Sequence, residues 1–81
     1  MDFIFTNKSE KQFKNLPVYT QDYIRQKLVN FKNSWIWDIK SLVNMKPATH
    51  RIRTWDYRLI LQKKDDNFIV LKVWHRKEIY Q

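Results

Sequence analysis

Two arginines, Arg51 and Arg53, stand at alternate positions near the middle of the chain. The period-2 pattern of residues 49–54 predicts a β-strand, in which side chains two residues apart project from one face, about 6.5–7 Å apart. This distance is close to the repeat between phosphates on an extended nucleic-acid strand, and guanidinium groups bind phosphate oxygens in a fork. The pair therefore predicts a phosphate-binding face, although it also fits the solvated face of a half-buried sheet.

Two further arginines lie at the ends of predicted strands. Arg58 stands near the start of one strand, and Arg76 directly follows another. If the three strands are sequential antiparallel neighbours, their ends come together and these arginines could converge with the first pair. Convergence stays open at this point, because a register slip of one residue would turn a side chain to the opposite face.

The last residues add groups that could transfer protons. An imidazole exchanges protons near neutral pH, so His75 is a candidate acid or base. The phenol of Tyr80 is a candidate only where surrounding positive charge favours its ionised form. The structural alternatives are a satisfied or exposed histidine and an amphipathic cover over the core. His50 shares a face with Ile52, which predicts a packed side chain rather than a reactive one.

Tryptophan is abundant, with four residues in 81. Trp55, in a turn flanked by arginines, could stack on a nucleobase or fold back over a small core. Trp35 and Trp37 could form an apolar patch for a protein partner.

Charge and composition limit the classes of function. The chain carries 16 Lys and Arg against 8 Asp and Glu, a net charge of +8, which predicts attraction to a polyanion. It has no cysteine and only two histidines, which excludes a thiol nucleophile and argues against a zinc site. No signal peptide or apolar run of roughly 20 residues is present, so we expect a soluble cytoplasmic protein that does not enter a membrane.

The elements that must position these residues follow from hydrophobic periodicity. Residues 3–6 predict a short strand, and a helix should begin near Asn7, with Ser9 as a candidate cap, and end before Pro17. A second helix should begin near Pro17 and form an antiparallel hairpin with the first. The stretch around residues 39–43 predicts a short helix or an irregular segment.

The second half of the chain changes to period 2. Residues 49–54, 57–63 and 68–75 predict three strands joined by turns at 55–56 and 65–67. With no glycine in the chain, turns should rely on Asn and Asp. The prediction is a single α+β domain over residues 1–81, with the order βααβββ: an N-terminal strand and a helical hairpin packed on an antiparallel sheet of about four strands.

Two segments taken together resemble the RelE/ParE toxin superfamily. They are residues 51–60 (RIRTWDYRLI) and residues 75–80 (HRKEIY), separated by an apolar strand. The family pattern has a basic pair, a Gly-Asp-Tyr-Arg step and a terminal arginine and tyrosine at this spacing. The resemblance covers essentially the whole chain, including the strand–helix–helix opening.

The resemblance implies a toxin that cleaves mRNA in the ribosomal A site and is inhibited by a cognate acidic antitoxin, with no metal or organic cofactor. It implies attack of a ribose 2′-oxygen on the adjacent phosphate. Arg51 and Arg53 would match the basic pair, and Arg58 the phosphate-binding arginine. Of the remaining positions, Arg76 would act on the leaving group, Tyr80 would be the base or a platform for the target base, and His75 could supply an acid. Lys77 and Trp55 would join Arg51 and Arg53 in binding RNA.

Two departures from the family pattern leave alternatives open. Trp55 replaces the family glycine, and arginine stands at positions 51 and 53, where some relatives have lysine, although arginine is a poor proton shuttle. A toxin of the same fold that inhibits DNA gyrase is the first alternative. A non-catalytic basic RNA-binding module is the second.

Overall fold

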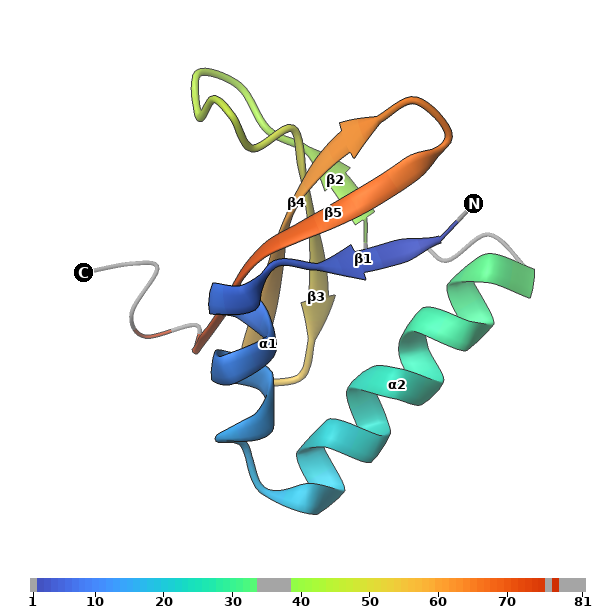
Figure 1. Ribbon diagram of the computed structural model, residues 1–81, viewed down its shortest axis with the longest axis vertical. Coiled ribbons are helices and arrows are strands. Elements are labelled where there is room, and N and C mark those ends of the chain that lie inside the picture. Colours follow the sequence, from blue (N-terminus) through green and yellow to red (C-terminus); the bar gives the residue numbers. More distant parts are fainter. Residues whose placement is uncertain (1, 34–38, 76, 78–81) are drawn as a thin grey trace.

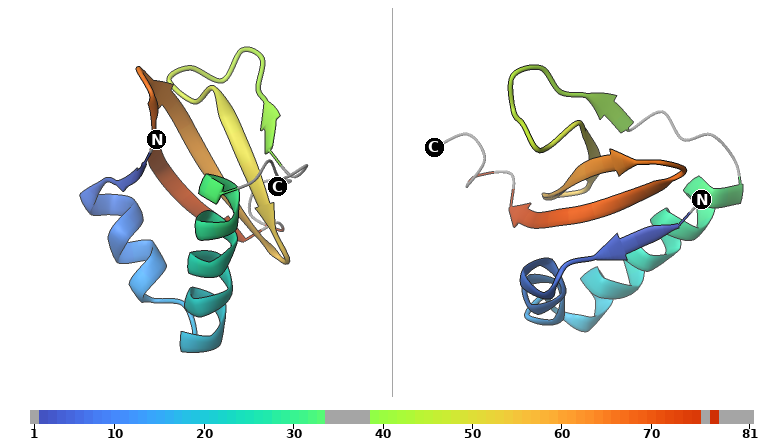
Figure 2. Two further views of the ribbon diagram at one scale, coloured as in Figure 1. Left: turned by 90° about the vertical axis from the view of Figure 1, so that its right-hand side faces the viewer. Right: turned by 45° about the horizontal axis from the view of Figure 1, so that its top comes forward.

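The computed structural model describes residues 2–33, 39–75 and 77 (Figure 1). Two helices pack on one face of a five-stranded sheet, which confirms the α+β class (Figure 2). The elements are, in chain order, β1 (Phe3–Phe5), α1 (Asn7–Lys14), α2 (Val18–Asn33), β2 (Ile39–Ser41), β3 (His50–Thr54), β4 (Tyr57–Lys64) and β5 (Asn67–His75).

The sheet has the strand order β1-β5-β4-β3-β2 and is mixed rather than wholly antiparallel. Strands β2 to β5 pair antiparallel in sequence order, as expected for hairpins. The first strand instead lies parallel to β5, with Phe3 opposite Phe68. Parallel neighbours need a long connection, and here the helical hairpin and the other strands all lie between the two in sequence.

The strand β2 corrects the prediction of a short helix or irregular segment at residues 39–43. Residues 39–41 pair with β3, and Ile39 lies opposite Ile52 on the face that carries the core. Three residues are too few for a periodic pattern to be recognised, so the pairing partner decides the structure. Asn44, at φ 61°, then turns the chain, as expected of asparagine in a protein without glycine.

The helical hairpin forms where it was predicted, but its first cap is Thr6 rather than Ser9. The Thr6 hydroxyl oxygen accepts the backbone N–H of Ser9 at 3.1 Å, because Thr6 is extended while Ser9 already lies in the first helical turn. The joint between the helices is tied by Gln21, whose side-chain amide donates to the carbonyls of Lys14 and Leu16.

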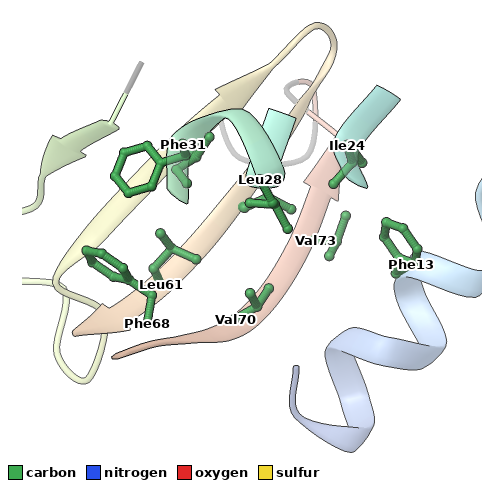
Figure 3. Close-up of a cluster of buried hydrophobic side chains, with 10 residues drawn as sticks. Phe13, Ile24, Leu28, Phe31, Leu61, Phe68, Val70 and Val73 are labelled. Carbon is green, nitrogen blue, oxygen red and sulfur yellow. The ribbon is translucent and has the colours of Figure 1, made fainter. Parts of the chain in front are cut away.

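The hydrophobic core lies between the sheet and the helices (Figure 3). Ile24 and Leu28 of α2 and Phe13 of α1 reach the sheet at helical spacing. They meet a layer of side chains from three strands: Ile52, Leu59, Leu61, Phe68, Val70 and Val73. Because Leu59, Leu61 and Ile52 all face the helices, the alternate residues of β3 and β4 must face away from them.

Both predicted hairpin turns are present as two-residue loops. In each loop only the first residue has a positive φ, 54° at Trp55 and 56° at Asp65, which is the pattern of a type II′ turn. Aspartate tolerates this region, but a bulky residue such as tryptophan is an outlier there. The expectation that Asn and Asp would serve every such position is therefore wrong at Trp55.

Candidate functional site

The sheet face that α1 and α2 do not cover, here called the open face, gathers the arginines of the central strands. Arg51 and Arg53 alternate with the buried Ile52, so both project from this face, as predicted. Arg53 lies directly opposite Arg58 of β4, which places Arg58 on the same face. Cross-strand neighbours of this kind have Cβ atoms about 4.5–5.5 Å apart.

Arg58 differs from the other two arginines in its burial. Its side chain is 5% exposed, whereas Arg53 is exposed and Arg51 half-buried. One guanidinium nitrogen, Nη1, donates to the carbonyls of Trp55 at 2.8 Å and Tyr57 at 3.0 Å, both at the β3–β4 turn. Its Nε is buried and has no hydrogen-bond partner. Arg58 is thus a buried cation that holds the turn and keeps one donor unused.

Strand β5 adds residues to the open face that the sequence analysis did not select. Trp74 lies opposite Arg58, and Lys72 lies opposite Ile60. The Lys72 ammonium sits over the Trp74 ring, 4.3 Å from its centroid. At the other edge, Lys40 of β2 lies opposite Arg51. No local signal in the sequence placed Lys72 and Trp74 on this face, because strict alternation from the buried Val70 would place both on the helix face.

A β-bulge determines which side chains of β5 reach the open face. Ile60 pairs with Lys72, but its neighbour Leu61 pairs with Val70, so Leu71 is an extra residue on β5. Beyond an extra residue, alternation is inverted. Lys72 and Trp74 therefore lie on the open face, and Val73 packs in the core.

Among the described residues, no ion pair joins a cation of the open face to an acid. The two ion pairs found within residues 2–33, 39–75 and 77 are Lys14–Glu10 and Arg25–Asp22, both on the helices. The cross-strand rows contain Lys40, Arg51 and Lys72 in one line and Arg53 and Arg58 in the next. Two like charges 10 Å apart repel by roughly 0.4 kcal/mol in water and about 1.7 kcal/mol at an effective dielectric constant of 20. An anion bound here would relieve that repulsion.

The remaining candidates are placed differently. His75 lies opposite Tyr57, whose ring packs against the core, and the two rings meet edge to face at 5.2 Å. The structure therefore does not bring His75 onto the open face. Lys77 is exposed just beyond β5, and its backbone N–H donates to Nδ1 of His75 at 3.2 Å. Arg76 and Tyr80 lie outside the described residues, as do Trp35 and Trp37.

His50 is packed, as predicted. Its ring meets Phe68 edge to face at 5.4 Å, and its Nδ1 is 2.8 Å from the Thr49 hydroxyl. Burial, with a smaller contribution from Lys63, lowers the pKa of His50 below its ordinary value of 6.5. The neutral ring is favoured, which suits a structural residue.

A pocket of about 230 Å³ lies on the helix side of the molecule. It is lined by Phe5, Glu10, Phe13, Lys14, Arg25 and Leu28, and the Arg25 guanidinium lies 5.2 Å from the centre of the Phe13 ring. The pocket therefore lies on the opposite side of the sheet from Arg51, Arg53 and Arg58. Among the described residues, no three His, Asp or Glu side chains form a group that could hold a metal ion. None of the described helices is both long and apolar enough to cross a membrane.

The sequence matches one protein family over almost its whole length. Residues 3–80 match the family described as the ParE toxin of type II toxin-antitoxin system, parDE. The chain belongs to this family. None of the curated proteins matches it significantly.

Solved structures of the wider RelE/ParE superfamily share the fold. The RelB-RelE antitoxin-toxin complex from Methanococcus jannaschii holds a chain 26% identical to this one, with a TM-score of 0.72 over 96% of this chain and 95% of that one. A chain of the toxin-antitoxin complex RelBE2 from Mycobacterium tuberculosis is 20% identical, with a TM-score of 0.76 over 93% and 96%. The YoeB/ParE toxin from Agrobacterium tumefaciens is 13% identical, with a TM-score of 0.71 over 93% and 98%.

These matches confirm the resemblance to the RelE/ParE superfamily and identify the chain as a toxin of a type II toxin–antitoxin system. Position 55 departs from the family pattern that the sequence resembles, which has a glycine directly before Asp-Tyr-Arg. A glycine expected before Asp-Tyr-Arg would adopt the positive φ without cost, whereas a left-handed conformation costs other residues roughly 1–2 kcal/mol. Here Trp55 stacks on Tyr23 of α2, with ring centroids 4.4 Å apart and planes 7° apart. Such a stack contributes about 0.5–1.5 kcal/mol and offsets part of the strain.

Trp55 nevertheless remains 61% exposed, so one face of the indole covers Tyr23 while much of the ring contacts solvent. The indole folds back on the helix layer, as the structural alternative expected. Stacking on a nucleobase stays a prediction, for which the exposed part of the ring leaves surface.

Proposed function

We propose that this toxin is an endoribonuclease that cleaves mRNA in the ribosomal A site. The single observation that carries the proposal is the gathering of Arg51, Arg53 and Arg58 on the one face of the sheet that neither helix covers. Guanidinium groups that form no ion pair with an acid among the described residues are suited to bind phosphate diesters, and the +8 net charge favours approach to RNA.

The proposed reaction uses the RNA's own 2′-hydroxyl as nucleophile. The 2′-oxygen attacks the adjacent phosphorus, the bond from phosphorus to the 5′-oxygen breaks, and a 2′,3′-cyclic phosphate and a 5′-hydroxyl result. The 2′-hydroxyl loses a proton to a base, and the leaving 5′-oxygen gains one. The reaction itself requires no metal ion or organic cofactor.

The roles divide between charge stabilisation and proton transfer. Arg51 and Arg53 bind successive phosphates, and Arg58 adds positive charge from beneath them. By resemblance to the family, Arg76 stabilises or protonates the leaving 5′-oxygen, Tyr80 in its ionised form accepts the 2′-proton, and Lys77 contacts RNA. His75 is not part of the proposed chemistry, because its ring lies on the helix side with Tyr57.

A cognate acidic antitoxin is the proposed inhibitor and partner. The RelE-like relative from Methanococcus jannaschii was solved as an antitoxin–toxin complex. A net charge of +8 makes an acidic chain the complementary partner, and electrostatic attraction would speed their association. We expect a neighbouring reading frame that encodes a short acidic protein.

A gyrase inhibitor is the second candidate, and the matching family itself favours it, since that family is described by the ParE toxin of parDE. In this case the open face would bind a protein surface, and mRNA would remain intact. A basic RNA-binding module without catalysis is a third possibility, in which arginine substitutions weaken RNA affinity but no transcript is cut.

Mapping of mRNA 5′ ends after induction of the toxin alone separates these candidates. We expect growth arrest with new 5′ ends inside translated codons. Arg53→Gln should abolish both, because the loss of one charge-stabilising donor lowers the rate about 10²–10³-fold. The matched control is Lys64→Gln, which removes the same charge from the exposed far end of β4.

Intact mRNA together with inhibited supercoiling by purified gyrase would replace the nuclease with the second candidate. Healthy growth at high expression would argue against toxicity of either kind.

A further inference from the structure

The Lys72 ammonium occupies a defined place on the open face. It lies 4.3 Å from the centre of the Trp74 ring, which is a favourable cation–π geometry. Trp74 in turn lies opposite Arg58, and Arg58 lies opposite Arg53. Arg53, Arg58 and Trp74 therefore form one cross-strand row over β3, β4 and β5. The Lys72 ammonium adds a third cation beside this row, through its contact with the Trp74 ring.

The middle cation of this row is the least accessible one. Arg58 is 5% exposed, and its Nη1 is already engaged by the carbonyls of Trp55 and Tyr57. Arg53 on one side is exposed, and Lys72 on the other is half-buried. A ligand that approaches the open face would therefore meet Arg53 and Lys72 first, with the Arg58 charge behind them.

The contact between Lys72 and the Trp74 ring reduces the conformational entropy that the lysine side chain would lose on binding a phosphate. A free lysine loses rotamer freedom when it binds, whereas this side chain already rests on an aromatic ring. The ring does not neutralise the ammonium, so its charge remains available to an anion. No acidic side chain lies in the two cross-strand rows that contain Lys40, Arg51, Lys72, Arg53 and Arg58.

We propose that Lys72 and Arg53 are the two accessible arms of one RNA phosphate-binding site, with buried Arg58 between them and Trp74 as the seat of the lysine. The inference rests on the proposed function and adds a residue to it that the family motifs do not contain. The ligand is a phosphate diester of single-stranded RNA, which two cations from strands on either side of Arg58 can hold from opposite sides.

The experiment measures binding of a single-stranded RNA octamer that carries 2′-O-methyl groups and cannot be cleaved by 2′-attack. Affinity is measured by fluorescence anisotropy at several salt concentrations. Lys72→Gln should weaken binding about 5–10-fold and reduce the slope of log affinity against log salt by about 0.7, the value for one lost single-strand contact. Lys72→Arg, which keeps the charge, should stay within about twofold of the wild type.

Two matched variants test the geometry. Lys64→Gln removes the same charge from the same strand face, six residues along β4 from Arg58 and so roughly 20 Å away, and should leave the slope unchanged. Trp74→Leu removes the ring but not the lysine, and should weaken binding by less than Lys72→Gln does. Thermal melting of each variant checks that folding is intact.

Equal affinities and slopes for Lys72→Gln and Lys64→Gln would overturn the inference, and so would a wild type that does not bind the octamer. Failure of the nuclease proposal is separate. If Lys72→Gln weakens binding as expected but 5′-end mapping shows intact mRNA, the phosphate site stands and the cleavage activity does not.

Discussion

Two consecutive residues of β4, Arg58 and Leu59, are almost equally buried but belong to opposite faces of one sheet. Leu59, 0% exposed, packs among the side chains of α2, β3 and β5. Arg58 is covered on the open face with its guanidinium bonded to two turn carbonyls and its Nε unpaired. At these two positions, burial packs an aliphatic side chain into the core on one face and holds a charge in place on the other.

The physical reasons for the two kinds of burial are distinct. Removing an aliphatic side chain from water stabilises the fold by about 1.5–3 kcal/mol. Removing a guanidinium from water is unfavourable unless its donors are paired, and one of the donors of Arg58 is not. We infer that Leu59 stabilises the fold from the helix face, whereas Arg58 holds charge in place on the open face at some expense of stability.

The sharpest test of the comparison is Leu59→Ala. Leu59 is fully buried in the core, so loss of its side chain should lower the free energy of unfolding by about 2–5 kcal/mol. Urea denaturation followed by tryptophan fluorescence measures this. Leu59→Met is the control and should cost less than about 1.5 kcal/mol. A loss below 1 kcal/mol for Leu59→Ala would show that the helix face is not the stabilising one.

Arg58→Met tests the other face at the neighbouring position. We expect a change of less than about 1 kcal/mol in the free energy of unfolding, because the lost hydrogen bonds are offset by removal of a buried, incompletely paired charge. RNA cleavage should fall about 10²-fold or more. Urea denaturation and 5′-end mapping of the same variant show whether Arg58 serves stability or activity. Destabilisation by several kcal/mol with activity retained would make Arg58 a structural residue.

Trp55 lies where the two faces meet, at the β3–β4 turn, and a pair of substitutions separates its strain from its stacking. Trp55→Ala keeps the positive φ and loses the Tyr23 stack, whereas Trp55→Gly loses the stack but relieves the strain. Trp55→Gly should therefore be the more stable of the two by about 1 kcal/mol. Thermal melting compares them. Equal stabilities would mean that the turn is not strained.

The smallest expected effect concerns His50 on the helix face. Because burial lowers the pKa of His50 in the folded protein, the unfolded chain takes up the proton first as pH falls through 6.5. The free energy of unfolding should therefore be independent of His50 above pH 6.5 and should fall as the pH decreases toward 5.5. His50→Gln should flatten this part of the profile of melting temperature against pH. A wild-type profile that rises toward pH 5.5 would contradict the stated direction.

Much of this arrangement follows from local sequence. The alternation around Ile52 places Arg51 and Arg53 on one face, the stripe on α2 begins after Pro17, and both hairpin turns lie where they were predicted. These features depend on residues close together in the chain, so periodicity reveals them. The motifs of residues 51–60 and 75–80 likewise indicated the family that the comparisons confirm.

Other features depend on strands that are distant in sequence, and only the folded structure decides them. Strict alternation along β5 would place Lys72 with Val70 on the helix face and His75 on the open face. The pairing of β4 with β5 shifts register between Ile60 and Leu61, and this leaves Leu71 as an extra residue. The extra residue reverses both placements. The parallel place of β1, the strand β2 and the contact of Trp55 with Tyr23 are non-local in the same way. The amino-acid sequence alone thus determines which cations are present. The pairing of strands determines which of them share a face, because a register shift of one residue turns a side chain to the other side of the sheet.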